Sequence, residues 1–448
     1  MRWPWAALLI LCGCAPGGSG VDERPNIVLL IADDMDHEHL GFAGHPLAPT
    51  PNLDALAARG IVFSHGFVPT PRCRPSQAAL LTGLWPHQNG VYFNVGSEHI
   101  APEDALPNHL KSAGYATIGE GKFWEVDPRA MGFSNEAIVN YETFVRAGQE
   151  HLFEFLDAHA GRQPFFVWWA PQLPHVPHDA PERLLERFPR ESIPVPAWLQ
   201  EDAARRERFL DRERAALAMA AWLDEGVGEL CAKLRELGAY ENTLFVFLID
   251  NGWANGSVSK GWALDKGLRT PVVFAWRAGI AGGASYADLV STVDVYATLL
   301  DFAGAPIPAR CAGRSLRPRI EGRASEARTA LYGALYPETP TAAQADAERD
   351  AYGLWARTER WKYILTLRDV HKKSGAGNED DERDDVRAIL VPSFERARGD
   401  EELYDLERDP EERVNLAARP EHGALKAHFK DEILAWWRAS GGGALDVP

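Results

Sequence analysis

The stretch Asn26-Ile-Val-Leu-Leu-Ile-Ala-Asp-Asp34 is an apolar run that ends in two aspartates. An apolar run of this length is typical of a strand that is covered on both faces of a sheet. Three more runs of the same kind follow along the chain, at 165–170, 244–249 and 272–276. The four runs predict buried, parallel strands.

Segments with helical periodicity lie between these runs, at 52–59, 106–113, 150–158 and 201–237. Strands that alternate with helices indicate an α/β fold, with a mostly parallel central sheet flanked by helices. After about residue 325 the pattern changes to alternating runs at 331–335, 352–355 and 361–367, followed by a helical pattern at 425–438. We therefore expect a large domain over 21–325 and a smaller C-terminal α+β subdomain over 326–448 with an antiparallel sheet. The polar stretches 339–350 and 372–385 are interpreted as solvated loops.

Polar residues follow three of the predicted strands. The first strand ends in Asp33-Asp34, the second is followed by His175 and His178, and the third by Asp250-Asn251-Gly252. In open α/β sheets ligands bind beyond the carboxyl ends of the strands, so these side chains should meet at one edge. This convergence predicts a metal or anion site.

The donor types favour a hard cation at that site. Carboxylate and amide oxygens from Asp33, Asp34, Asp250 and Asn251 suit Ca²⁺ or Mg²⁺ better than Zn²⁺. Each pair taken alone has an ordinary structural explanation, since adjacent aspartates also cap helices and Asn-Gly is a common turn. Two such pairs at strand ends of one sheet favour the metal.

The chain of 448 residues carries a formal charge of −17, from 47 basic and 64 acidic residues. Sequence-independent nucleic-acid binding needs a cationic surface, so no nucleic-acid partner is expected. A local cationic pocket for an anionic substrate remains compatible with this total.

The first twenty residues form a predicted export signal and tether. Arg2 precedes an apolar run that ends in Leu11-Cys-Gly-Cys14, and Ala-Pro-Gly-Gly-Ser-Gly follows. The run is too short to span a bilayer. Leu-Cys-Gly-Cys resembles a bacterial lipobox, in which Cys14 would be lipidated and become the mature N-terminus; an ordinary secretory signal is the alternative. We expect an exported protein in the periplasm or cell envelope, on the outer membrane of a Gram-negative source, attached to the membrane by acyl chains only.

Five cysteines are too few for a disulfide scaffold in a chain of this length. Cys231 falls on the apolar stripe of the predicted helix 201–237 and is expected in the core, whereas Asp224 interrupts that stripe without an evident reason. Cys311 lies in a loop rich in proline and glycine, and the sequence leaves open whether it is free. Cys73 stands in a different context.

The segment Cys73-Arg-Pro-Ser-Gln-Ala-Ala-Leu-Leu-Thr-Gly83 resembles the signature of the type I sulfatases, members of the alkaline-phosphatase-like superfamily. The resemblance continues through nearly the whole mature chain. Matching segments include the opening strand to Asp34, Thr50-Pro-Asn-Leu-Asp-Ala-Leu-Ala-Ala-Arg-Gly60, the segment after Gly83, and Glu402-Leu-Tyr-Asp-Leu-Glu-Arg-Asp-Pro410. The resemblance implies the alkaline-phosphatase-like fold and hydrolysis of sulfate esters.

The same resemblance implies roles for individual residues. Asp33, Asp34, Asp250 and Asn251 match the calcium ligands, and Cys73 would be oxidised by a maturation enzyme to formylglycine, next to the metal. In the family the hydrated aldehyde of that residue attacks sulfur, and a second hydroxyl then expels sulfate. Lys122 and Lys260 match sulfate-binding lysines, and His175 matches a histidine that binds sulfate and protonates the leaving oxygen, with His178 as its rival. Taken alone, either lysine would be read as a surface residue and His175 as a residue that shapes its proline-flanked loop.

Two positions depart from the family pattern: Gln77 stands where the signature has arginine, and Trp124 stands where a histidine follows the lysine. Gln77 donates hydrogen bonds but carries no charge. The departures bear on maturation of Cys73 and on catalytic power rather than on the fold.

Three functions compete. The leading hypothesis is an exported sulfatase that acts on a sulfated carbohydrate or small molecule. The second is a phosphoester or phosphonate hydrolase on the same fold, against which Cys73 and the two lysines argue. The third is a catalytically impaired surface protein that binds sulfated ligands, which Gln77 and Trp124 favour.

Overall fold

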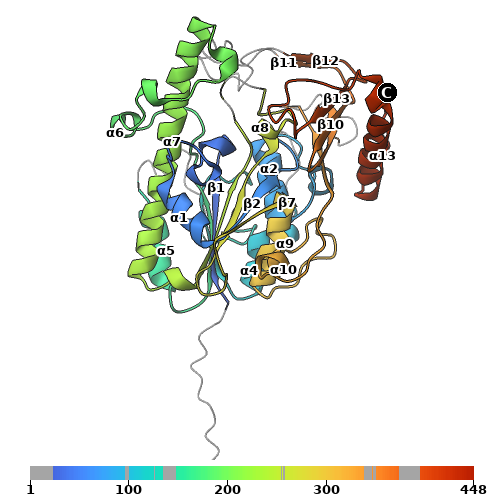
Figure 1. The fold of residues 1–448 in the computed structure, drawn as a ribbon. Coiled ribbons are helices and arrows are strands. Elements are labelled where there is room, and N and C mark those ends of the chain that lie inside the picture. Colours follow the sequence, from blue (N-terminus) through green and yellow to red (C-terminus); the bar gives the residue numbers. More distant parts are fainter. Residues whose placement is uncertain are drawn as a thin grey trace, which may run out of the picture.

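The computed structural model describes residues 24–95, 100–125, 127–134, 148–253, 255, 258–337, 346, 350–372 and 394–448. Within these residues a seven-stranded sheet lies between two layers of helices, with a second sheet of four strands beside it (Figure 1). The strands of the main sheet are β1 (Asn26–Ala32), β2 (Ile61–Phe67), β3 (Ala116–Gly121), β4 (Phe165–Ala170), β5 (Thr243–Ile249), β6 (Val272–Ala275) and β7 (Ala284–Ser291).

The main sheet has the order β3-β4-β1-β5-β6-β2-β7. β3, β4, β1 and β5 run parallel, as do β2 and β7, so the predicted mostly parallel α/β sheet is confirmed. The prediction for 272–276 is wrong in direction, because β6 runs antiparallel to both of its neighbours. A strand buried on both faces is apolar whichever way it runs, so composition could not give its direction.

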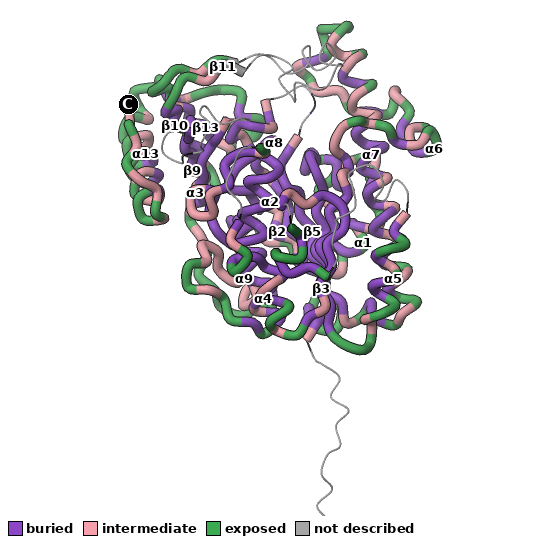
Figure 2. Tube along the Cα trace, turned by 180° about the vertical axis from the view of Figure 1, so that it is seen from behind, coloured by how far each residue is buried: buried purple, intermediate pink, exposed green. Residues whose placement is uncertain are grey.

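Alternate residues of β1 face opposite layers, as strand geometry requires. Val28 and Leu30 pack with helices α1 (Pro51–Arg59), α5 (Glu150–His159) and α7 (Ala203–Glu236). Leu29 and Ile31 pack with α2 (Cys73–Thr82), α4 (Leu106–Ser112) and α9 (Thr292–Phe302). Figure 2 shows the buried sheet enclosed by these helices. Shorter helices are α3 (Pro86–Asn89), α6 (Glu182–Leu185), α8 (Asp265–Leu268) and α10 (Arg317–Ile320).

The C-terminal part forms the predicted antiparallel sheet and closing helix. The elements are β8 (Ala330–Leu335), β9 (Gly353–Thr358), β10 (Trp361–Thr366), β13 (Glu401–Asp405) and α13 (Gly423–Ala439), with a separate pair β11 (Val370–Lys372) and β12 (Phe394–Arg396). The strands of the sheet pair in the order β13-β10-β9-β8. Helix α13 packs its apolar face on this sheet through Phe429, Ile433 and Trp437.

Several other expectations have a clear outcome. Cys231 is buried in the core, and Cys311 is a free cysteine. The stretches 339–350 and 372–385 lie almost wholly outside the described residues. Cys14 also lies outside them. The boundary between 325 and 326 stays a prediction. No helix in the described ranges is both long and apolar enough to cross a membrane.

Candidate active site

The two acidic pairs meet because β1 and β5 are adjacent parallel strands. Their register places Ala32 opposite Ile249, so Asp33-Asp34 and Asp250-Asn251 leave the sheet side by side. The backbone N–H of Asp34 donates to Oδ1 of Asp250 at 3.1 Å, and Asn251 Nδ2 donates to Oδ1 of Asp34 at 2.7 Å. Asp34 has a φ of 55°, a left-handed conformation that non-glycine residues rarely adopt. Local strain thus accompanies the turn that presents its carboxylate.

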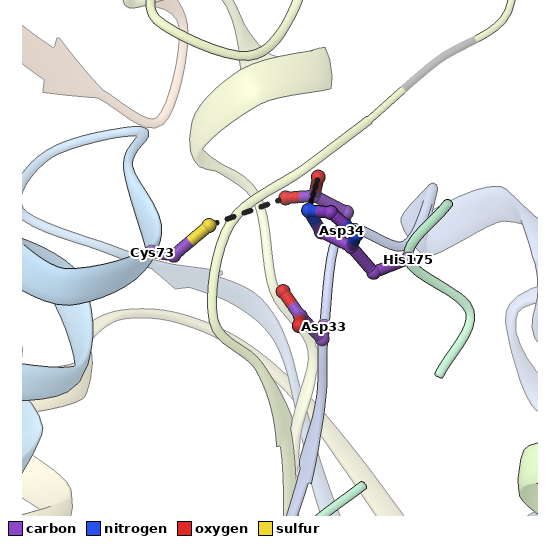
Figure 3. Close-up of side chains that lie close together, drawn as sticks. All are labelled: Asp33, Asp34, Cys73 and His175. Atoms are coloured by element: carbon purple, nitrogen blue, oxygen red, sulfur yellow. Dashed lines mark hydrogen bonds and ion pairs between the residues drawn. The ribbon is translucent and has the colours of Figure 1, made fainter. Parts of the chain in front are cut away.

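Cys73 begins α2 and lies against this acidic group. Its Sγ is 3.7 Å from Oδ1 of Asp34, and the residue is 1% exposed. Burial raises the pKa of the thiol to about 12, so an unmodified Cys73 is a neutral thiol at physiological pH and a poor nucleophile. One ligand atom from each of Asp33, Asp34, Cys73 and His175 lies within 4.8 Å of the others (Figure 3).

Two lysines, Lys122 which is buried and Lys260 which is half-buried, supply positive charge to the same edge. Lys122 follows β3, and its Nζ donates to both carboxylate oxygens of Asp33, at 2.7 and 2.6 Å. Lys260 Nζ donates to Oδ2 of Asp34 at 2.5 Å. Burial opposes the charge on each lysine, but the neighbouring carboxylates outweigh burial and raise both pKa values above the usual range. Both ammonium groups therefore stay charged at any physiological pH.

Of the two candidate histidines, His175 belongs to the cluster around Asp34 and His178 does not. The Nε2 of His175 is 3.3 Å from Oδ2 of Asp34, whereas the ring of His178 contacts the ring of Trp253 at 5.5 Å between centroids. The Nδ1 of His175 lies 2.6 Å from the carbonyl oxygen of Val176, which can only accept, so Nδ1 carries a proton. Nε2 is then protonated only in the imidazolium. Burial lowers the pKa of His175.

The acidic residues respond differently to burial. Burial and the charge of Asp33 raise the pKa of Asp250 well above its usual range. Burial also acts on Asp34, but Lys260, His175 and Lys122 outweigh it and lower the pKa of Asp34. Burial and the neighbouring Asp33 thus oppose ionisation of Asp250, a cost that a bound divalent cation would reduce.

The residues fit a hard cation by their donors. Three carboxylates and the Asn251 amide are oxygen ligands, and Asn251 Oδ1 is buried without a hydrogen-bond partner among the described residues. Gln77 Oε1 is a second buried acceptor without a partner in that part of the chain. Buried oxygens without partners are costly unless something polar or charged contacts them.

The two departures noted in the sequence both contact the site. Gln77 Nε2 donates to Oδ2 of Asp250 at 2.8 Å. Trp124 is half-buried, and Lys122 Nζ lies 5.0 Å from the centroid of its ring. The indole N–H of Trp124 is buried and has no partner among the described residues. Both side chains thus occupy the site as neutral groups.

One supporting pair was not predicted. Arg74 Nε and Glu125 Oε1 lie 3.3 Å apart, and both side chains are buried, at 6% and 3% exposure. Arg74 follows Cys73, and Glu125 lies three residues after Lys122, so the pair ties the start of α2 to the loop after β3. No signal in the sequence links two residues 51 positions apart.

Comparison with known proteins gives family matches over most of the chain. The sulfatase family model matches residues 25–305, and the model for the C-terminal part of N-sulphoglucosamine sulphohydrolase matches residues 254–383. An ulvan-active sulfatase of Formosa agariphila is 25% identical over 432 residues, which cover 94% of this chain and 82% of that protein.

Two solved structures share the fold. One is a protein in complex with its substrate D-glucosamine-2-N,6-O-disulfate, with a TM-score of 0.75, 20% identity, and coverage of 93% of this chain and 98% of that one. The other is a phosphonate monoester hydrolase of Agrobacterium radiobacter, with a TM-score of 0.72, 21% identity, and coverage of 93% and 96%. At these identities the likeness extends to the fold and not to the activity.

Proposed function

The chain belongs to the sulfatase family, and on that premise we propose that it removes sulfate from a sulfated carbohydrate. Membership makes the chain a sulfuric ester hydrolase, which adds water to a sulfate ester and releases an alcohol, sulfate and a proton. The carbohydrate class is supported by the ulvan-active relative and by the amino-sugar disulfate bound in the structural neighbour.

The observation that carries the proposal is the gathering of Lys122, Lys260 and His175 around the carboxylates beside Cys73. A sulfate ester is a stable anion, so its cleavage depends on neutralising charge on the sulfate oxygens. Both lysines stay charged, and the low polarity of a buried site strengthens their attraction for a sulfate oxygen.

Asp33, Asp34, Asp250 and Asn251 would hold the divalent cation, which we propose to be Ca²⁺ in preference to Mg²⁺. When bound, the cation would withdraw electron density from the sulfate group as a Lewis acid. Two observations support this assignment: Oδ1 of Asn251 has no partner among the described residues, and the carboxylates of Asp33 and Asp34 lie close together. Lys122 and Lys260, which contact the same carboxylates, would then be released toward the substrate.

We propose that a maturation enzyme converts Cys73 to formylglycine, whose hydrated aldehyde supplies the nucleophile. The buried thiol with its raised pKa is unsuited to attack sulfur by itself, which supports a modified residue. His175, with Nδ1 held by the carbonyl of Val176, would deliver the proton on Nε2 to the departing alcohol oxygen. Gln77 would orient Asp250 through its hydrogen bond.

The test is a parallel assay of nitrophenyl sulfate, nitrophenyl phosphate and phenylphosphonate with protein from a host that matures sulfatases. We expect sulfate release to dominate, to require Ca²⁺ after chelation, and to disappear in Cys73→Ala. The phosphonate hydrolase in the structural comparison makes the reverse preference the second candidate. Tight binding of a sulfated sugar without turnover of any ester would favour the binding protein instead.

We also propose that the protein is exported and held at the cell envelope by lipid on Cys14. The support is the sequence Leu11-Cys-Gly-Cys14 with its apolar run and the glycine-rich tether behind it. Acyl chains would then be the membrane attachment, and the active site would face the periplasm, where polymeric sulfated substrates are accessible.

A further inference from the structure

A cavity of about 470 Å³ lies at the junction of the two sheets, and its lining shares no residue with the cluster around Cys73. Its walls come from β2, from α8 and the residue after it, from the end of β9 and the β9–β10 turn, and from the segment after β13. The volume falls within the roughly 300–1,000 Å³ typical of small-molecule sites. Three of the lining residues are the arginines Arg269, Arg357 and Arg360.

The buried charges beside this cavity do not balance. Arg357 and Lys362 are 3% and 0% exposed, and both contact the carboxylate of Asp265, at 3.2 and 2.6 Å. The other nearby buried acid is Glu412, whose Oε1 lies 3.4 Å from Nζ of Lys362 and whose pKa is raised by burial to about 8. Asp265 and Glu412 thus face two buried cations before Arg269 is counted.

Arg269 adds a third positive charge without an acid of its own. Its Nε donates to the carbonyl of Ser64 at 3.1 Å, and no carboxylate of the described residues lies within ion-pair distance of it. Burial and the neighbouring Arg357 oppose its charge, although Asp265 favours it. The Nε of Arg357 is buried and has no acceptor in the described part of the chain. In the wall of the cavity, Arg269 therefore has N–H groups to offer a ligand, and the guanidinium of Arg357 adds positive charge beside it.

The positive charge of the two arginines also affects His65, which lines the cavity. Burial, followed by the charges of Arg269 and Arg357, lowers the pKa of His65 to about 4, against a smaller opposing effect of Asp265. The acids Glu359 and Glu407 lie at the mouth, where water screens them, and the Glu407 side chain is 70% exposed. Arg269 and Arg357 therefore bring positive charge to the wall of the cavity beside Asp265, and Glu359 and Glu407 lie with Arg360 at its mouth.

We propose that this cavity is a second oxyanion site that binds a sulfate group through Arg269 and Arg357, with Arg360 at its entrance. Guanidinium groups match tetrahedral and carboxylate oxyanions through paired N–H donors. Arg360 is already held by Asp405 at 2.7 Å and would act through charge at the opening rather than as the main contact. The bound group would be inorganic sulfate or the sulfate of a carbohydrate.

The direct test is a crystal of the full chain soaked in selenate, which mimics sulfate and is located by anomalous scattering. We expect a peak within hydrogen-bond distance of Arg269. Calorimetric titration of Lys260→Ala, whose active site is weakened, should still report one sulfate site. Arg269→Gln should weaken that site about 10- to 100-fold, the range for loss of one charged hydrogen bond.

Controls separate binding from folding and identify the source of the anion. Arg277→Gln removes an exposed arginine paired with Glu241 and should leave sulfate affinity unchanged. Should Arg269→Gln fail to fold, Arg360→Gln provides the milder variant, with an expected loss of a few-fold. Titration with glucosamine that carries one O-sulfate identifies the ligand. Tighter binding of the sulfated sugar than of sulfate indicates a carbohydrate site, and tighter binding of sulfate indicates a site for the free ion. Two results would overturn the proposal. One is the absence of a selenate peak at Arg269. The other is that adding Arg269→Gln to the Lys260→Ala protein leaves its affinity for sulfate unchanged.

Discussion

Gln77 donates a hydrogen bond from its amide Nε2 to Oδ2 of Asp250 at 2.8 Å, and burial together with the charge of Asp33 raises the pKa of this carboxyl group. The contact orients Asp250 but brings no charge to it. An arginine at the same position would bring a guanidinium to this carboxylate and favour its ionised form.

Gln77→Arg is therefore expected to raise turnover of a sulfate ester, by about tenfold, because a charged donor is stronger than a neutral one. It should also raise the fraction of Cys73 that carries formylglycine, measured by mass spectrometry of the peptide from a maturing host. Gln77→Ala, the matched control, removes the donor and should lower turnover. A fall in both quantities for Gln77→Arg would mean that the pocket is adapted to glutamine. Unmodified Cys73 in a host that matures other sulfatases would favour the binding protein.

Trp124 makes a cation–π contact with Lys122, whose Nζ lies 5.0 Å from the centroid of the indole ring. A partly buried cation–π contact contributes about 1–2 kcal/mol. Trp124→Ala should therefore lower kcat/KM for a sulfate ester by about tenfold, while Trp124→Phe keeps an aromatic face and should retain most of the activity. Steady-state kinetics on both variants checks this. Equal losses in Phe and Ala would show that the buried indole N–H, rather than the ring face, is what matters.

In the main sheet, the sequence predicted the strands that are apolar throughout and missed β2, β3 and β7, which are not. Every residue of β1, β4 and β5 is buried, so each of these strands is a continuous apolar run in the sequence. β2 contains Ser64, His65 and Gly66, and β7 is an edge strand that alternates exposed and half-buried residues over its first half. Polar interruptions and edge positions weaken the apolar signal on which prediction depends.

The candidate site was predictable as far as it depends on strand ends and motif positions. Asp33, Asp34, Asp250 and Asn251 are neighbours because β1 and β5 are adjacent, which the strand order determines. The Arg74–Glu125 pair and the cavity at Arg269 depend on contacts between distant segments, and no local pattern encodes them. The reason for Asp224 in an apolar stripe also needed the structure.

Asp224 caps a helix from across the core. It is 1% exposed, and its carboxylate accepts hydrogen bonds from the backbone N–H groups of Asn52 and Leu53, at 2.9 and 2.8 Å, in the first turn of α1. Asp224→Ala leaves these donors buried and unpaired and should lower the free energy of unfolding by about 2 kcal/mol or more. Asp224→Asn keeps one acceptor oxygen and should cost less. Urea denaturation measures both, and equal stability of Ala and wild type would contradict the capping role.

Cys14 is expected to carry the lipid anchor. Cells expressing the wild type in the presence of a labelled fatty acid should incorporate label into the protein, and Cys14→Ser should abolish it. Cys12→Ser, which changes the neighbouring cysteine of the predicted signal, is the matched control and should still be labelled. Equal labelling of wild type and Cys14→Ser would mean that the lipobox interpretation is wrong, and release of unlabelled protein would favour an ordinary secretory signal.

The buried pair His39–Glu213 predicts a pH dependence of stability. His39 Nε2 lies 2.7 Å from Glu213 Oε1, and side-chain exposures are 3% and 12%. Burial opposes protonation of His39, but Glu213 and, less strongly, Asp36 outweigh burial and Lys266, so the pKa of His39 is raised above 6.5. A raised folded-state pKa gives stability that is complete below about pH 6.5 and is lost as pH rises through the folded value.

The urea concentration at the midpoint of unfolding of the wild type should therefore decrease as the pH is raised from 6 to 9. Glu213→Gln should make this decrease smaller, because His39 loses the negative charge that holds its proton. The matched control is Glu207→Gln on the same helix, where an exposed carboxylate pairs with Arg190 and should not affect the pH dependence. Since each variant is compared with itself at two pH values, a general loss of stability in Glu213→Gln does not obscure the result. Identical pH dependence in the wild type and Glu213→Gln would show that the pair is not the source.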